Sequence, residues 1–467
     1  MLILQPSVQL ADPHICSDAK NRLNILTAVF DPLIRRDLYG NFIPALATAW
    51  HVADDAQTWT FHLRDDVVFH NGDSLTAIDV VASLRRACDP AVGGELGTEG
   101  VWASYLGQAE ITATDSTTVQ LITPVPMADL LELLVAIPIM PTAVLGDVPN
   151  SLVGSGPWQL VSRSESEVVL EAFDGSRVRQ ASAGRAVWRA EPDEQKRLAA
   201  LLSGTADLVT ELSQQSANKV KTADLRLLAH QSNLCVAFLC NASRGLTAHK
   251  AFRQALNYAI NVERMIDRAH DGAATPLNGP LTPLHFGCDP ALPPYPYDPA
   301  KARSLLADFA GAKLVVDLPT RLPDEAPLLG EMLAEDLTAV GLEVEQHHYS
   351  DRTGYAHMIK AKQIHDVCCF DSSPLSTYRT LREKLNSDVA GPWWQGYSNP
   401  QVNSLLDQAS RTPNDAQRQS IYRMAYGLMR DDAPWIFLYR PTLFWGVSHK
   451  AGNVMVGPDG FLRLEAA

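Results

Sequence analysis

The sequence predicts an α/β protein of two or three domains. A chain of 467 residues exceeds the usual size of one domain, and 46% apolar with 20% charged residues is ordinary for a globular protein with a sizeable core. Between residues 300 and 370, strands alternate with single helices, the order typical of parallel sheets. Before about Pro149, short strands and turns predominate.

The first clear element is a strand followed by a capped helix. The sequence TWTFHLR at 58–64 alternates polar and apolar side chains, as in a half-buried strand. Thr76, three residues before Asp79, predicts the N-cap of an amphipathic helix that continues through Leu84. We expect His70 and these aspartates to serve turns and caps, because no nucleophile or metal ligand lies at suitable spacing.

The middle of the chain contains a turn and two helices. Gly-Ser-Gly-Pro at 154–157 predicts a tight bend before an alternating hairpin, and no Lys-Ser/Thr follows as a phosphate-binding loop requires. From Glu194, EQKRLAALLSGTADLV predicts a helix, a glycine stop and a strand. The run AFRQALNYAINVERMIDRA at 251–269 predicts one amphipathic helix.

After Asp298-Pro299, which predicts an N-cap and a first-turn proline, helices and strands alternate. The expected elements are helix 300–309, strand 313–318, helix 325–340, strand 342–349, helix 352–362 and strand 365–370. In open parallel sheets, ligands bind beyond the carboxyl ends of the strands. The sequence therefore predicts ligand contacts at 319–321, 350–352 and 371–374.

Composition and charge exclude several classes of protein. A net charge of −14 and a pI near 5.4 argue against nucleic-acid binding, which needs clustered Lys and Arg. No apolar run approaches the ~20 residues that span a bilayer. The first residues, MLILQPSVQLADPH, show no signal peptide. Either the chain begins downstream of the natural start, through trimming or a misplaced start, or the protein is cytoplasmic.

The seven cysteines predict buried free thiols. An odd count forbids complete pairing within the chain. Cys235 and Cys240 lie five apart in a strand-like run and face opposite sides, and the adjacent Cys368 and Cys369 could pair only with strain.

Residues 42–79, FIPALATAWHVADDAQTWTFHLRDDVVFHNGDSLTAID, resemble the extracytoplasmic solute-binding proteins, family 5, of peptide, opine and nickel ABC importers. The turn at 154–157 is similar to the Gly-Thr-Gly-Pro turn of that family, with Ser155 for threonine, and the 251–269 helix is a further hallmark. The resemblance covers nearly the whole chain.

The resemblance implies a bilobed periplasmic-binding-protein fold, type II, cluster C: two α/β lobes, a hinge and a subdomain inserted in the first lobe. The expected boundaries are 1–40 with 150–237 and 446–467 for the first lobe, 41–149 for the insertion and 238–445 for the second lobe. The chain would cross between lobes near 234–241 and 434–445.

The resemblance also implies the function. A periplasmic monomer would close about its hinge, like a Venus flytrap, over a small polar solute and deliver it to the permease of an ABC importer. Peptides, opines and related carboxylate-bearing compounds are the expected solutes. We expect no catalysis, no cofactor and no metal site.

Relatives of this family hold ligand at the end of the strand corresponding to 365–370. There they place an aromatic residue and, in peptide binders, an aspartate before a proline. Here the segment is Phe370, Asp371, Ser372, Ser373 and Pro374. Because Ser373 precedes the proline, the amine-binding carboxylate is absent at that position unless Asp371 replaces it.

Further candidate contacts come from aromatic and charged side chains. Trp102 matches an aromatic wall residue of the inserted region in relatives, and Trp393 with Trp394 offers flat apolar area to a solute. The loop before the first-lobe helix lines the cleft in relatives. Its candidate residues are Ser17, Asp18, Asn21 and Arg22. Arg22, Arg352 and Arg379 could each bind a carboxylate through two hydrogen bonds, and convergence of two would predict a carboxylate-bearing solute.

Two alternative functions remain open in the sequence. Ser17 to Lys20 formally satisfies the Ser-x-x-Lys pattern of a class of hydrolases, although the companion motifs are missing. Thirteen histidines also leave open the binding of a metal chelate or haem. His347 and His348 are expected to face opposite sides of one strand, which argues against a joint metal clamp.

Overall fold

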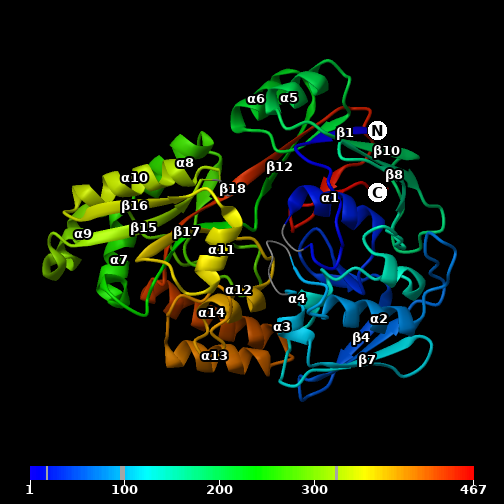
Figure 1. Cartoon of the computed structure of the whole chain (residues 1–467), viewed down its shortest axis with the longest axis horizontal. Helices are drawn as coiled ribbons and strands as arrows, with labels where there is room; N and C mark the ends of the chain where they lie inside the picture. Colours follow the sequence, from blue (N-terminus) through cyan, green and yellow to red (C-terminus); the bar gives the residue numbers. More distant parts are fainter. Residues whose placement is uncertain (17–18, 95–99, 321–323, 467) are drawn as a thin grey trace. The chain divides into compact units, whose positions relative to one another are not determined.

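A computed structural model describes residues 1–16, 19–94, 100–320 and 324–466 (Figure 1). Its contacts divide the chain into a first unit, Met1–His230 with Leu443–Ala467, and a second unit, Gln231–Thr442. The chain therefore crosses between the units twice. The subdivision of the first unit into a lobe and an insertion stays a prediction.

The first unit contains two main sheets. In one, β11, β1, β10, β9 and β8 are neighbours in that order, and in the other β4, β5, β7 and β6 are neighbours. The strands are β1 (Leu2–Gln5), β2 (Ile34–Arg36), β3 (Phe42–Pro44), β4 (Ala47–Val52), β5 (Thr58–Leu63), β6 (Glu110–Ala113), β7 (Thr118–Ile122), β8 (Trp158–Arg163), β9 (Glu167–Ala172), β10 (Arg185–Ala190), β11 (Leu208–Val209), β12 (Arg226–Gln231, whose last residue belongs to the second unit), β19 (Met455–Val456) and β20 (Leu462–Arg463). The helices are α1 (Lys20–Val29), α2 (Ala77–Ala87), α3 (Ala103–Leu106), α4 (Leu131–Leu134), η2 (Thr142–Asp147), α5 (Glu194–Leu202) and α6 (Gln214–Thr222).

The predicted strand and cap in this unit are confirmed. In β5, Trp59, Phe61 and Leu63 are buried, as the period of two requires. At the start of α2, the Asp79 carboxylate accepts hydrogen bonds from the Thr76 N–H at 2.9 Å and from the Thr76 hydroxyl at 2.7 Å. A neighbouring carboxylate thus holds the chain at the entry to the helix.

The second unit is built on a sheet in the order β16, β15, β17, β13 and β18. Its strands are β13 (Cys235–Cys240), β14 (Ala274–Pro276), β15 (Lys313–Pro319), β16 (Glu343–Tyr349), β17 (Val367–Ser372) and most of β18 (Trp435–Val447), whose last residues pair with β11. Its helices are η3 (Leu246–Ala248), α7 (Lys250–Ala259), α8 (Val262–His270), α9 (Pro299–Leu305), η4 (Ala307–Phe309), α10 (Ala326–Ala339), α11 (Arg352–Lys360), α12 (Thr377–Leu385), α13 (Pro400–Ser410) and α14 (Asp415–Asp432).

The predicted alternation after residue 298 is confirmed. Strand β15 pairs in parallel with β16 and β17, because each connection crosses back through a helix. Helices α7 to α10 pack on one face of this sheet and α11 to α14 on the other (Figure 1). This arrangement brings the carboxyl ends of β15, β16 and β17 to one edge.

One predicted helix is wrong. Residues 251–269 form not one helix but two, α7 and α8, with extended backbone at Ile260 (φ −88°, ψ 128°). The side chain of Asn261 accepts from the Arg264 N–H at 3.0 Å, and Asp336 accepts the Asn261 N–H at 2.9 Å. Asn261 therefore caps a second helix inside a pattern whose apolar period continues across the break.

The cysteine prediction is confirmed. All seven cysteines are buried thiols outside any disulfide bond. Cys235 and Cys240 belong to the two different cores that cover opposite faces of the second-unit sheet. Burial raises the pKa of both thiols to about 12, which keeps them protonated and unreactive.

In the described ranges, none of the helices combines the length and the apolar composition that crossing a bilayer requires.

Candidate functional site

The segment after β17 is fixed by contacts from other parts of the second unit. The side-chain amide of Asn233 donates to the Ser373 carbonyl. His285 accepts the Thr282 N–H on Nδ1 at 3.1 Å, so its Nε2 carries the proton and donates to the Pro374 carbonyl at 2.9 Å. Sequence reasoning missed both supports, because residues about 90 or more positions away from the segment provide them.

Four predicted contacts lie at the carboxyl end of β17: Phe370, Asp371 and Ser372 are the last residues of the strand, and Ser373 follows it. Phe370 is 8% exposed and its ring packs against Trp393 with 5.4 Å between centroids. Asp371 and Ser373 are half-buried. Ser372 is 2% exposed, and its hydroxyl has no hydrogen-bond partner among the described residues. A buried hydroxyl left in this way is a candidate to bind water or solute.

The two predicted arginines of this unit lie in the first turns of α11 and α12. Arg352 is the first residue of α11, directly after the Asp351 cap, and its guanidinium lies 5.9 Å from the Tyr355 ring. No hydrogen bond or ion pair of its side chain occurs within the part of the chain that the structure describes. Arg379, 7% exposed, lies in the first turn of α12.

The tryptophan pair has two different environments. The Trp393 ring contacts Phe370 and also lies 5.4 Å from the ammonium of Lys360. The indole N–H of Trp394 donates to the Tyr397 carbonyl at 2.6 Å, and its ring is half-buried. Of the sequence candidates, Phe370 and Trp393 are thus in direct contact.

The first unit holds the remaining candidates. Ser17 and Asp18 lie outside the described residues, as does Arg321 of the predicted strand-end segment. The Asn21 carbonyl accepts from Gln5 at 2.8 Å, and the Arg22 guanidinium donates to the Gln9 carbonyl at 3.1 Å. Trp102 is 2% exposed, and its indole N–H donates to the His14 carbonyl at 3.1 Å.

The contact of Trp102 belongs to a buried polar cluster that the sequence did not predict. Arg86 forms a two-pronged ion pair with Asp12, at 3.0 and 2.6 Å. The same guanidinium lies 3.0 Å from His14 Nδ1, and Nε2 lies 3.0 Å from the Pro138 carbonyl. Since a guanidinium only donates, His14 is neutral, with its proton on Nε2. This network fixes residues 12–14.

This cluster predicts a loss of stability in acid. Burial lowers the pKa of His14 to about 4, against about 6.5 in an unfolded chain. Between these values the unfolded chain binds a proton that the folded protein excludes. The contribution of His14 is therefore complete above about pH 6.5 and is lost as the pH falls toward about 4, at up to about 1.4 kcal/mol per pH unit.

Urea unfolding at several pH values checks this expectation. His14→Gln should flatten the fall in the free energy of unfolding between about pH 6.5 and 4, whereas His51→Gln, at an exposed position on β4, should leave the curve as in the wild type. Parallel curves for wild type and His14→Gln would contradict the assignment.

Comparison with known proteins shows the family. Residues 41–416 match the bacterial extracellular solute-binding proteins, family 5 (middle), so the chain belongs to this family. It is a substrate-binding component of an ABC transporter. Members of the family are non-catalytic components of transport systems, which removes the hydrolase alternative.

Individual relatives extend over nearly the whole chain. The glutathione-binding protein GsiB of Pectobacterium atrosepticum is 28% identical and covers 98% of this chain and 91% of its own length. Heme-binding protein A of Haemophilus influenzae is 25% identical over 90% of this chain and 82% of its own. The structure of HbpA2 from Haemophilus parasuis has a TM-score of 0.85 at 18% identity and covers 100% of both chains. The fold is that of the cluster C periplasmic binding proteins.

Proposed function

We propose that this substrate-binding component takes up a small peptide-like or opine-like solute with at least one carboxylate. The observation that carries the proposal is the similarity to a glutathione-binding protein over 98% of the chain, since glutathione is a short peptide with free carboxylates. In the proposal, a periplasmic monomer delivers the solute to the permease of its importer.

The carboxyl edge of β15, β16 and β17 supplies chemistry that suits such a solute. Arg352 presents a guanidinium at the amino end of α11, where the helix dipole also favours an anion. In the proposal, the Asp371 carboxylate binds an amine of the solute and the Ser372 hydroxyl binds a further polar group. Trp393, whose ring packs against Phe370, and Trp394 offer apolar area to the solute in the proposal. Asn21, Arg22, Trp102 and Arg379 remain proposed contacts.

A binding screen on the purified protein tests the proposal. Glutathione, di- to tetrapeptides and opines are titrated separately by calorimetry and by thermal shift. A true solute at 100 times its dissociation constant stabilises the folded protein by about 2.7 kcal/mol. We expect at least one peptide-like or opine-like compound to bind with one solute per chain. The absence of any such binding would contradict the proposal.

Two substitutions test the site. Arg352→Gln and Asp371→Asn should each weaken binding about 10- to 100-fold, because a hydrogen bond to a charged group contributes about 1.5 to 3 kcal/mol. The matched controls are Arg303→Gln and Asp308→Asn, at exposed positions of the same unit. Solute-free melting temperatures should be unchanged in all four. Unaltered affinity in both test variants would remove these residues from the site.

The relationship to heme-binding protein A supports a second candidate, a haem or a metal chelate. Haem and a nickel–histidine chelate therefore belong in the same screen. If only these bind with one ligand per chain, the peptide-like solute is wrong and the chelate function replaces it.

A further inference from the structure

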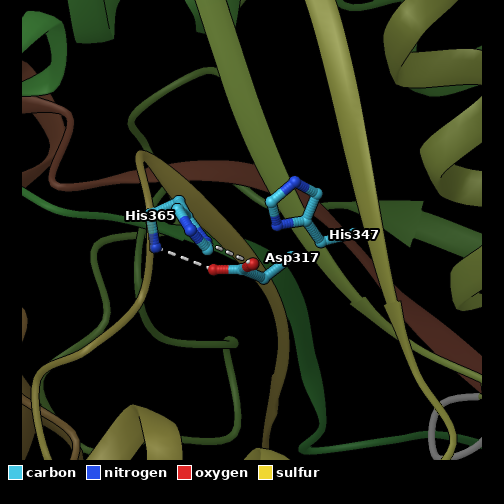
Figure 2. Close-up of side chains that lie close together, drawn as sticks. All are labelled: Asp317, His347 and His365. Carbon is cyan, nitrogen blue, oxygen red and sulfur yellow. Dashed lines mark hydrogen bonds and ion pairs between the residues drawn. The ribbon is translucent and has the colours of Figure 1, made fainter.

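Three side chains from distant parts of the sequence meet on the second-unit sheet. They are Asp317 from β15, His347 from β16 and His365 from the turn before β17 (Figure 2). One ligand atom from each residue lies within 4.8 Å of the other two. Asp317 and His347 are partners in the parallel ladder, so their side chains project from the same face. None of the three is a proposed solute contact.

Asp317 supplies a buried carboxylate. The residue is 0% exposed. Its Oδ2 accepts the His365 backbone N–H at 2.8 Å, and its Oδ1 accepts the Tyr349 hydroxyl at 3.0 Å and lies 2.8 Å from His365 Nδ1. Within the described ranges, no Lys or Arg pairs with Asp317. A buried carboxylate requires positive charge close by, which leaves His365 or a bound cation to supply it.

His347 is oriented for ligation by a second carboxylate. Its Nε2 lies 2.7 Å from Glu345 Oε1, so the proton sits on Nε2 and the lone pair on Nδ1. A carboxylate behind a histidine is the arrangement that commonly orients metal-binding imidazoles. The ring of His347 points toward Asp317 and His365 (Figure 2), and the two imidazoles meet edge to face with 4.6 Å between centroids.

We propose that Asp317, His347 and His365 bind one divalent transition-metal ion of the Zn²⁺ type. Two imidazoles and one carboxylate are ligands that zinc takes in sites with an open fourth position. With bonds of about 2.0 to 2.1 Å in tetrahedral geometry, ligand atoms lie about 3.4 Å apart. The three ligand atoms now lie at most 4.8 Å apart, so the two that are farthest apart must approach each other by at most about 1.4 Å. Rotation of the side chains provides this movement.

The surroundings suit an exchangeable ion. The side chains of His347 and His365 are 35% and 43% exposed, which gives the ion a route from solvent. In the free protein, His365 Nδ1 donates a proton to Asp317 Oδ1 at 2.8 Å. On binding, that proton leaves Nδ1, the ring holds its proton on Nε2, and Nδ1 offers its lone pair to the ion. The Tyr349 hydroxyl donates to Asp317 Oδ1 at 3.0 Å and so orients the carboxylate. The ion would join β15, β16 and the segment just before β17.

Titration of the full chain, without a histidine tag and stripped with a chelator, tests the proposal. We expect ZnCl₂ to bind with one ion per chain, Co²⁺ to give the visible absorption of a tetrahedral site, and Mg²⁺, which prefers oxygen ligands, not to bind. His347→Gln and His365→Gln should each weaken Zn²⁺ binding by more than the ~10- to 100-fold that loss of an outer-shell partner costs.

His348→Gln is the matched control, because the neighbouring residue on β16 faces the opposite side and is exposed. His357→Gln, exposed on α11, is a second control. Both should bind Zn²⁺ as the wild type does. Circular dichroism establishes that the test variants are folded. Absence of stoichiometric Zn²⁺ binding, or equal losses in the test and control variants, would overturn the proposal. Both outcomes are independent of the solute screen.

Discussion

Replacing Arg179 with methionine is expected to lower the free energy of unfolding of the first unit by about 3 to 5 kcal/mol, the cost of removing one partner from a buried ion pair. Arg179 bridges Asp31, at 2.8 Å, and Glu465, also at 2.8 Å, and its side chain is 7% exposed. It also donates to the carbonyls of Thr27 at 2.9 Å and Phe30 at 3.1 Å. Burial opposes the charge, but the two carboxylates outweigh it and raise the pKa of Arg179.

The expected loss of stability comes mainly from the buried carboxylate that remains after Arg179 is removed. Asp31 is 0% exposed, so methionine in place of Arg179 leaves a carboxylate without its cation. Arg189→Met is the matched control: it removes an arginine from an exposed pair with Glu167, with side chains 51% and 36% exposed, and should cost at most about 1 kcal/mol. Urea unfolding measures both variants. Equal effects would show that the buried network contributes no more than a surface pair.

Replacing Gly154 with alanine should destabilise the same unit by about 3 kcal/mol, the upper part of the range for overpacking a close contact. A Cβ at this position would lie 2.1 Å from the Val29 carbonyl oxygen and 2.8 Å from the Phe30 ring. The adjacent Ser155 hydroxyl donates to Asp31 at 3.1 Å, which ties the turn to the Arg179 network. Neither the backbone carbonyl nor the turn can retreat easily.

Gly146→Ala is the control for this prediction. Gly146 has no atom within 4 Å of an added Cβ and no left-handed backbone angle. Its substitution should change the melting temperature little, whereas Gly154→Ala should lower it by several degrees. A melting temperature unchanged in Gly154→Ala would show that the α1 end and the turn move apart at little cost. Gly154 would then be needed only to let the backbone form the turn.

The close approach of two backbone segments therefore explains the glycines of the 154–157 turn, which the turn pattern of the sequence explained only in part. The sequence predicted a tight bend at 154–157 from its glycines. The structure adds the reason: the bend passes against the carbonyls of Ala28 and Val29 at the end of α1. A contact between residues more than a hundred positions apart has no signature in either segment alone.

The candidate sites likewise contain features that the sequence predicted and features that only the structure revealed. The strand-end rule selected 371–374 and Arg352 from the alternation of elements. Phe370 came from the family resemblance and Trp393 from its aromatic side chain, and the structure shows that these two rings are in contact. The rule could not find Asn233 or His285, which hold that segment from other elements. Likewise, His347 and His348 were predicted to face opposite sides of their strand. The sequence did not predict that His347 lies beside Asp317 and His365, because this depends on the register between β15 and β16.

The sequence by itself determined the family and most of the secondary structure of this protein, because periodicity, capping and turn chemistry are local properties of the chain. The break at Asn261 escaped it because the apolar period continues through the break and a carboxylate from α10 holds the capping residue. Only the tertiary structure decided which polar groups converge. Burial and the pairing of distant strands bring together Arg179 with its two carboxylates and Asp317 with its two histidines.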